Sequence, residues 1–323
     1  MAAWPDSPAT GIVDLHHAAA VDFTPLLDEE VWAWREALDW DMHAAAQLVH
    51  QHIEARSLQG FALLDGTQAI GYCYYVRDGR KGLLGDVYVM AKSRTPEREN
   101  ALLEAALEAL WRSPGMERIE AQLLLFGTAR GNSPSPRQMP YSSSLHVYPR
   151  LYLEIPVDAA SRLAIRDTPG VTITPWTEAR QDDSVRLVAA AYRGHIDSDI
   201  NDQYRSPAGA RRFLSNIIQY PGCGTFFAPA SYMALSERNL CGISLASLVG
   251  ERTGHITQIC AAPAHRGQGI GYALLRRSLL AFAEHGCERV SLTVTAANQE
   301  AIRLYRQMGF SLRRQFTAYV WTP

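Results

Sequence analysis

Residues 255–275 read HITQICAAPAHRGQGIGYALL, and they carry the most specific signal in the sequence. A strand-like apolar run ends just before Pro263, and the string RGQGIG at 266–271 places three glycines at alternate positions. Apolar residues then recur at helical spacing. A glycine turn that enters a helix presents free backbone N–H groups and the positive end of the helix dipole. We therefore expect an anion site between this strand and this helix.

Two common glycine motifs do not fit the string. A phosphate-binding P-loop requires Lys-Ser or Lys-Thr after its last glycine, whereas Tyr272 follows Gly271. A dinucleotide fingerprint requires GxGxxG after the first strand of a large parallel fold. Here the glycines lie about fifty residues from the end of the sequence, which leaves no room for such a fold. A nicotinamide enzyme is therefore disfavoured.

The strand, the RGQGIG turn and the helix resemble the acyl-CoA-binding motif of the GNAT N-acetyltransferase superfamily. Downstream, the pattern Asn298-x-x-Ala301-x-x-x-Tyr305-x-x-x-Gly309-Phe310 resembles a later motif of that family. The resemblance is strongest over residues 240–321 and extends more weakly over the rest of the second half.

The same pattern recurs in the first half. Residues 89–103 (VMAKSRTPERENALL) align without a gap with residues 261–275, so that Arg94 falls on Arg266 and the two Ala-Leu-Leu triplets coincide. At the three glycine positions the first copy has Thr95, Glu97 and Glu99. Side chains there block close backbone approach, and two glutamates repel a phosphate. We expect a degenerate copy without a coenzyme site; the alternative is a chance alignment.

The resemblance implies an α/β (α+β) fold with two tandem GNAT-like domains, each a mixed, mostly antiparallel sheet flanked by helices. We expect a degenerate GNAT-like domain at 1–160 and a catalytic domain that binds acetyl-CoA at 161–323. Periodicity predicts one helical stretch over 28–57 and a hairpin around Asp65-Gly66. The Gly, Ser and Pro content of 127–150 predicts an irregular loop.

The resemblance also assigns residues to the coenzyme. The expected acetyl-CoA contacts are Ile259, Cys260, Ala261, Arg266, Gly267, Gln268, Gly269, Ile270, Gly271 and Asn298. The N–H of Ala261 is the expected donor to the thioester carbonyl. Arg266 either contacts a phosphate or closes the loop, and Asn298 either contacts the coenzyme or caps a helix.

Tyr305 matches the tyrosine that protonates the leaving thiolate as the general acid in the family; its alternative role is an ordinary buried aromatic. Many relatives carry a glutamate on the strand before the loop, whereas this sequence has Thr257 and Gln258. Neither accepts a proton at neutral pH, so the general base is unassigned. His255 is a possible base, but a lone histidine on a strand is more often structural.

The acceptor is expected to meet the polar segment AYRGHIDSDINDQYR (191–205), which occupies the place that lines the acceptor pocket in relatives. The candidate substrate contacts are Tyr192, His195, Asp197 and Tyr204. The acidic character of the segment suggests a cationic acceptor, and the alternative is a solvated loop. We expect no metal, because no other cluster of ligands supports the spaced His and Asp residues of this segment.

Composition limits the remaining classes. The 323 residues contain 31 Lys and Arg against 33 Asp and Glu, a formal net charge of −2 that gives no support for nucleic-acid or membrane-surface binding. Five cysteines without a CxxC pair favour a reducing cytoplasm. We find no signal-peptide pattern, and the uncharged run 240–250 is too short to span a bilayer.

These observations predict a cytoplasmic N-acetyltransferase that transfers an acetyl group from acetyl-CoA to a small-molecule or peptide amine, without nucleic-acid or membrane partners. The alternative is a non-catalytic acyl-CoA-binding or regulatory module. The sequence sets neither the acceptor nor the oligomeric state.

Overall fold

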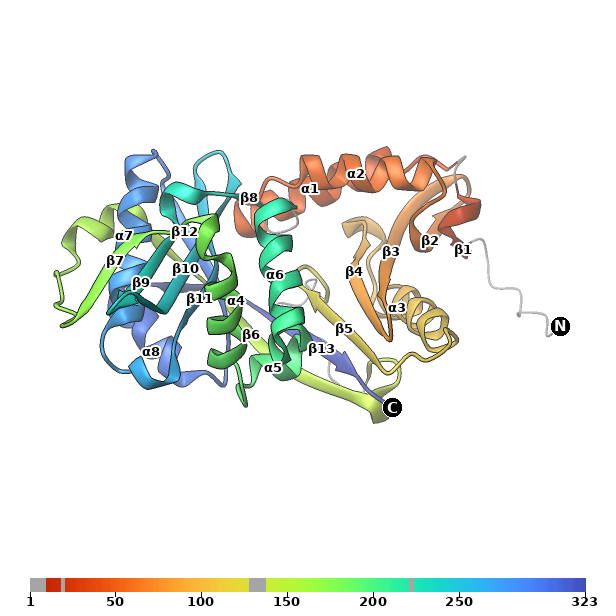
Figure 1. Ribbon diagram of the computed structural model, residues 1–323. Coiled ribbons are helices and arrows are strands. Elements are labelled where there is room, and N and C mark those ends of the chain that lie inside the picture. Colours follow the sequence, from red (N-terminus) through yellow and green to blue (C-terminus); the bar gives the residue numbers. More distant parts are fainter. Residues whose placement is uncertain (1–9, 19–20, 128–137, 221–223) are drawn as a thin grey trace. The chain divides into compact units, whose positions relative to one another are not determined.

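The computed structural model describes residues 10–18, 21–127, 138–220 and 224–323 (Figure 1). Contacts divide the chain into two units. Unit 1 comprises Met1–Ala37, Met42–Tyr148 and Phe316–Pro323, and unit 2 comprises Leu38–Asp41 and Pro149–Gln315, apart from the residues outside those ranges. The expected division at 160/161 differs from this one because each unit includes residues from the other half of the sequence.

Unit 1 contains a mixed sheet in the order β1-β2-β3-β4-β5-β13. Every neighbouring pair in it is antiparallel except β4 and β5, which are parallel. The predicted Asp65-Gly66 hairpin joins β2 to β3, with Gly66 at φ +61°. The elements are β1 (Thr10–Asp14), α1 (Thr24–Leu38), α2 (His43–Glu54), β2 (Gln59–Asp65), β3 (Gln68–Asp78), β4 (Lys81–Val89), α3 (Pro96–Trp111), β5 (Arg118–Leu123) and β13 (Ser311–Trp321).

Unit 2 repeats this topology in the order β6-β12-β11-β10-β9-β7, with β8 paired to β10. Again one central pair, β11 and β12, is parallel and the others are antiparallel. The elements are β6 (Leu145–Pro156), β7 (Val171–Pro175), α4 (Gln181–Ala191), α5 (Asp197–Ile200), α6 (Pro207–Gln219), β8 (Thr225–Phe226), β9 (Tyr232–Ser236), β10 (Asn239–Gly250), β11 (Thr253–Ala261), α7 (Ile270–Glu284), β12 (Arg289–Thr295) and α8 (Gln299–Met308).

Helices cover both faces of the unit 2 sheet, as strand alternation requires. Ile243 and Leu245 of β10 pack in a core cluster with residues of α4 and α6. Ala246, the next residue, points to the opposite face and belongs to a cluster built from α7, α8, β6 and β12. Both units are therefore mixed, mostly antiparallel sheets flanked by helices, as predicted.

Two local expectations were wrong. The predicted helical stretch 28–57 is two helices, because Asp39 adopts a left-handed conformation at φ +55° and the chain leaves the helix to bury Trp40 in unit 2. The expected loop 127–150 gives way to β6 from Leu145, which pairs with β12; residues 128–137 lie outside the described structure. A 3₁₀ turn at Ala228–Ala230 separates β8 from β9.

Candidate active site

A cavity of about 470 Å³ opens in unit 2 where β11 and β12 stop pairing. Their parallel ladder runs from Thr253 and Arg289 to Ile256 and Leu292, and beyond this point both strands line the cavity. A register shift against β10 adds one extra residue on β11, at Thr257. A bulge of this kind turns a strand away from its neighbour and re-aims its side chains, and it coincides here with the gap.

The glycine turn forms one end of the cavity. Gly267 and Gly269 have φ values of +75° and +79°, a region that L side chains rarely adopt. Gly269 is the N-cap of α7, and no side chain caps this helix start. The first-turn N–H groups of a 15-residue helix therefore lack a side-chain partner here, which suits an anion.

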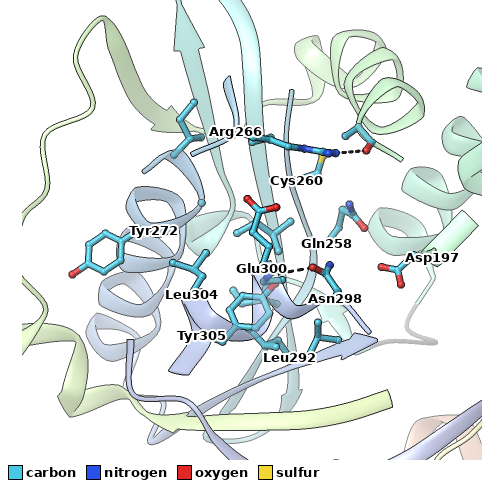
Figure 2. Close-up of a pocket in the computed structure, with 18 of the residues that line it drawn as sticks. Asp197, Gln258, Cys260, Arg266, Tyr272, Leu292, Asn298, Glu300, Leu304 and Tyr305 are labelled. Carbon is cyan, nitrogen blue, oxygen red and sulfur yellow. Dashed lines mark hydrogen bonds between the residues drawn. The ribbon is translucent and has the colours of Figure 1, made fainter. Parts of the chain in front are cut away.

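Arg266 closes the loop. Its guanidinium donates to the carbonyl of Ala191 at the end of α4, with Nη2 2.6 Å from the oxygen (Figure 2). Tyr272 also lines the cavity, and the guanidinium of Arg166 lies 3.9 Å from the centroid of its ring. Arg166 and Arg303 also line the cavity, and the sequence analysis singled out neither residue.

Most of the residues assigned to the coenzyme line this one cavity. They are Ile259, Cys260, Ala261, Arg266, Gly267, Gly269, Ile270, Gly271 and Asn298. Gln268 is outside the lining, and its side chain donates to the carbonyl of Ala264. Burial raises the pKa of the Cys260 thiol to about 12, so this thiol stays protonated at neutral pH.

Asn298 sits at the start of α8 and has two partners. Its Oδ1 accepts the N–H of Ala301 at 3.1 Å, the geometry of an N-cap. Its Nδ2 lies 3.2 Å from Nε2 of His195. This asparagine therefore caps the helix and also joins it to the predicted acceptor segment.

Tyr305 projects from α8 into the cavity wall and is 6% exposed. Burial raises the pKa of its hydroxyl above the ordinary value for tyrosine, the charge of Asp197 raises it further, and the charge of Arg150 opposes this effect. The hydroxyl therefore stays protonated throughout the neutral range, as a proton donor requires.

Two stacked tyrosines form an aromatic wall of the cavity. The rings of Tyr192 and Tyr204 stack at a centroid distance of 4.2 Å and an interplanar angle of 11°. Gln258 ties both rings to β11: its Nε2 donates to the Tyr192 hydroxyl at 2.9 Å, and its Oε1 accepts from the Tyr204 hydroxyl at 3.4 Å. The Tyr192 hydroxyl in turn donates to the carbonyl of Ile259.

Opposite charges meet on the cavity wall beside Tyr305. Arg150 of β6 holds Nη1 3.8 Å from Oδ1 of Asp197, and that oxygen also accepts the hydroxyl of Thr295. His195 lies next to them, with Nδ1 3.8 Å from Oδ2 of Asp197. All four predicted acceptor residues, Tyr192, His195, Asp197 and Tyr204, thus line one cavity, together with Arg150, which the sequence did not predict.

The structure also bears on two other possibilities raised by the sequence, His255 as a general base and a metal site. His255 is 5% exposed and lies outside the cavity lining. Its Nδ1 bonds Ser291 at 2.8 Å, and its ring stacks on Tyr152. Burial lowers its pKa to about 3, so it is a neutral core residue. Among the described residues no group of three or more His, Cys, Asp or Glu side chains is arranged to hold a metal ion.

Four cysteines, Cys73, Cys241, Cys260 and Cys287, are free thiols, and Cys223 lies outside the described residues. Within the described ranges, no helix has both the length and the apolar character needed to cross a membrane.

Comparison with known proteins adds three similarities. Residues 188–310 match the model of the acetyltransferase (GNAT) family. A 63-residue segment is 36% identical to the mycothiol acetyltransferase of Corynebacterium jeikeium, covering 20% of this chain but only 18% of that protein. Over 277 residues the chain is 22% identical to the mycothiol acetyltransferase of Propionibacterium freudenreichii, with 81% of each chain covered.

The fold likewise matches a solved structure. A tandem GNAT protein from the clavulanic acid biosynthesis pathway aligns over 97% of this chain and 98% of its own, with a TM-score of 0.64 and 13% identity. At this identity the match concerns the fold, and it extends over both units.

Proposed function

Because this chain belongs to the GNAT acetyltransferase family, we propose that its second unit transfers an acetyl group from acetyl-CoA to a primary amine. One observation carries the proposal: the uncapped glycine turn at the start of α7 opens directly onto the gap between β11 and β12. At this place an anion site lies next to an extended slot. This arrangement suits acetyl-CoA, in which a diphosphate is followed by a long, narrow arm.

The backbone of β11 supports this placement of the thioester. The N–H of Ala262 donates to the carbonyl of Cys241 on β10. Successive N–H groups of a strand point to opposite edges, so the N–H of Ala261 points away from β10, towards the gap. A donor at that place stabilises the negative charge that develops on the thioester oxygen when the amine attacks.

Tyr305 is the proposed general acid. When the tetrahedral intermediate collapses, the C–S bond breaks and the electron pair stays on sulfur, which then takes the phenolic proton. The buried hydroxyl remains protonated at neutral pH and lies on the cavity wall beside Asp197 and Arg150. Proton transfer from a positioned group of this kind contributes about 10²- to 10⁴-fold in rate.

We propose that unit 1 binds no coenzyme. Its α3 begins with Pro96 under a Thr95 cap, whose Oγ1 accepts the N–H of Arg98 at 3.3 Å. Arg94, the counterpart of Arg266, donates to the carbonyl of Val89 and lies 3.7 Å from the carboxylate of Glu99. The Thr95 cap thus uses a helix-start N–H group, whereas no side chain caps the start of α7, and we assign unit 1 a structural role.

A second candidate function is a non-catalytic acyl-CoA-binding module. The observation that favours it is Gln258, because the neutral amide is held by two tyrosine hydroxyls on the strand beside the cavity. If unit 2 is catalytic, the ammonium proton must leave through water or another group.

The proposed acceptor is a small-molecule amine or a peptide amine. Two of the similar proteins are named mycothiol acetyltransferase, and acetylation of a small molecule of that kind is one option here. We further propose a cytoplasmic setting without nucleic-acid or membrane partners, in keeping with the balanced charge.

Calorimetry with acetyl-CoA, combined with thiol release over a panel of amines, tests the proposal. We expect binding of one acetyl-CoA per chain and turnover with at least one amine. Binding without any turnover supports the non-catalytic module, and a chain that does not bind acetyl-CoA contradicts both functions.

A further inference from the structure

The Arg150–Asp197 pair belongs to the cavity and not to a closed core. Arg150 comes from β6 and Asp197 from the first turn of α5, yet both side chains reach the same wall, where they are 11% and 17% exposed. Figure 2 shows the Asp197 carboxylate directed from its helix towards Gln258 and Asn298.

Hydrogen bonds fix the orientation of both charges. Nη1 of Arg150 donates to Thr295 at 3.4 Å and Nη2 donates to Thr293 at 3.2 Å, both on β12. Oδ1 of Asp197 accepts the Thr295 hydroxyl, while Oδ2 lies 3.8 Å from the His195 ring, beyond hydrogen-bond distance. Of the two carboxylate oxygens, Oδ2 is therefore the one that is hydrogen-bonded to neither Thr295 nor His195.

The pair lines the same cavity as the proposed acid. Tyr305, Asp197 and Arg150 are all lining residues, and both charges act on the ionisation of the Tyr305 hydroxyl. We therefore expect an amine that attacks a thioester near Tyr305 to come close to both charges. A desolvated ion pair stabilises a fold little compared with apolar side chains of the same size, so the presence of both charges at this point requires another explanation.

We propose that Asp197 and Arg150 together recognise an acceptor that carries a carboxylate beside its primary amine, as a free amino acid does. This inference rests on the proposed function and names its substrate class. The ammonium binds the carboxylate of Asp197, and the carboxylate binds the guanidinium of Arg150. In such a ligand, one or two carbons, with bonds of about 1.5 Å, separate the ammonium from the carboxylate. This spacing is comparable to the 3.8 Å between Nη1 of Arg150 and Oδ1 of Asp197.

The charges exclude the simplest alternative. A purely cationic acceptor such as a diamine would gain from Asp197 but would be repelled by the buried guanidinium of Arg150 at the same wall. A peptide amine brings no carboxylate to the guanidinium, which then keeps its contact with Asp197. The matched positive and negative groups therefore favour a zwitterion.

The test compares matched acceptors on the full chain. The probes are L-amino acids, the corresponding amino-acid amides and the corresponding decarboxylated amines, with acetyl-CoA as donor and thiol release as readout. We expect the best amino acid to exceed its own amide and amine in kcat/KM by at least about tenfold, as expected for a charged hydrogen bond in a buried site. Equal or better use of the amide or amine overturns the inference.

Variants separate recognition from folding. Arg150→Met keeps the side-chain length and removes the charge, so we expect the ratio of kcat/KM for the amino acid to kcat/KM for its own amide to fall to about one, whatever the change in absolute rate. Thr293→Val removes one of the hydroxyls that orient the guanidinium and should reduce the preference partly. Arg289→Gln, an exposed arginine next to Glu154 and outside the cavity lining, is the control. A preference that survives in Arg150→Met contradicts the proposal.

A binding measurement distinguishes this inference from the proposed function. Calorimetric titration of the same amino acids and amides into the chain saturated with coenzyme A requires no turnover. If no amine is acetylated but amino acids still bind more tightly than their amides and lose this advantage in Arg150→Met, the catalytic function fails and the recognition site stands. If neither set binds preferentially, the recognition site fails whatever the activity.

Discussion

The amide nitrogen of Gln258 lies 2.9 Å from the phenolic oxygen of Tyr192, and through this bond a strand residue fixes the aromatic wall of the cavity. Gln258 is only 3% exposed, and burial raises the pKa of Tyr192 well above its ordinary value, with the neighbouring Tyr204 adding to the effect. Both groups are neutral. The contact therefore serves to position the wall and has no direct part in proton transfer.

We predict that Gln258→Met weakens acceptor binding. The thioether fills the same space but bonds neither hydroxyl, so the stacked tyrosines lose their anchor to β11. KM for the acceptor should rise about three- to tenfold, the cost of roughly one hydrogen bond, while the dissociation constant for acetyl-CoA stays the same. Steady-state kinetics and calorimetry check this pair of values; a variant with weakened coenzyme binding and an unchanged acceptor KM would contradict it.

Removal of the Tyr305 hydroxyl should reduce turnover selectively. In Tyr305→Phe we expect kcat to fall by about 10²-fold or more because the leaving thiolate loses its proton donor, with acetyl-CoA binding unchanged. Tyr220→Phe, a substitution at a 63% exposed position, is the matched control. Unchanged turnover in Tyr305→Phe excludes the acid role.

Two substitutions at Gly269 separate the effect of backbone conformation in the glycine turn from the effect of charge. Gly269→Ala introduces a Cβ at φ +79°, which costs about 1–2 kcal/mol of backbone strain and should weaken acetyl-CoA binding moderately. Gly269→Glu adds a negative charge at the anion site and should abolish binding. Glu97→Gln in unit 1 should change nothing, and a stoichiometry of two coenzymes per chain contradicts the proposed asymmetry between the units.

A buried pair of carboxyl groups makes the stability of unit 1 decrease as the pH rises. Glu30 and Asp86 are 6% and 7% exposed, and Tyr72 donates to Glu30 at 2.8 Å. Burial, and then the charge of Asp86, raises the pKa of Glu30 well above its ordinary value. The folded chain thus holds a proton that the unfolded chain releases above a pH of about 4.3.

The stability contributed by this proton is complete below that pH and is lost as the pH rises through the raised pKa of folded Glu30. Glu30→Gln mimics the protonated group, so we expect its free energy of unfolding to fall less than that of wild type between pH 5 and pH 8 (, a window of about three units). Urea unfolding at several pH values measures the difference, and Glu36→Gln on the exposed side of α1 is the control. Parallel pH profiles for Glu30→Gln and wild type would rule out the retained proton.

His255 gives unit 2 the opposite dependence. Burial lowers its pKa to about 3. Below a pH of about 6.5 the unfolded chain therefore binds a proton at this histidine, whereas the folded chain does not. The penalty is absent above that pH and grows by about 1.4 kcal/mol for each unit of acidification until the folded pKa is reached. His255→Gln should lose less stability on acidification than wild type, whereas His50→Gln, at a more exposed position, should behave as wild type.

Local signals in the sequence were sufficient for the repeated elements. The glycine turn and the Asp65-Gly66 hairpin depend on neighbouring residues, and each lies where it was predicted. The fold class was predicted from a resemblance carried by the same local motifs, and the structure confirms it.

Contacts between residues far apart in the sequence explain the two features that were not predicted, the place of Arg150 in the cavity and the break between α1 and α2. Arg150 lies in a segment rich in Gly, Ser and Pro, and it reaches the cavity because β6 pairs with β12, which lies about 140 residues further along the chain. The break between α1 and α2 has a similar origin, since Trp40 leaves the helical path to donate a hydrogen bond to Tyr152. Neither contact has a periodicity that a single sequence displays.

The assignment of strands to units has a consequence for the gene. β13 completes the sheet of unit 1 beside β5 although it is translated last, and β6 completes that of unit 2 although it precedes most of that unit. A cut at the midpoint of the reading frame would encode two fragments, each missing a strand that the other carries. Neither half of the reading frame therefore encodes all the strands of one unit.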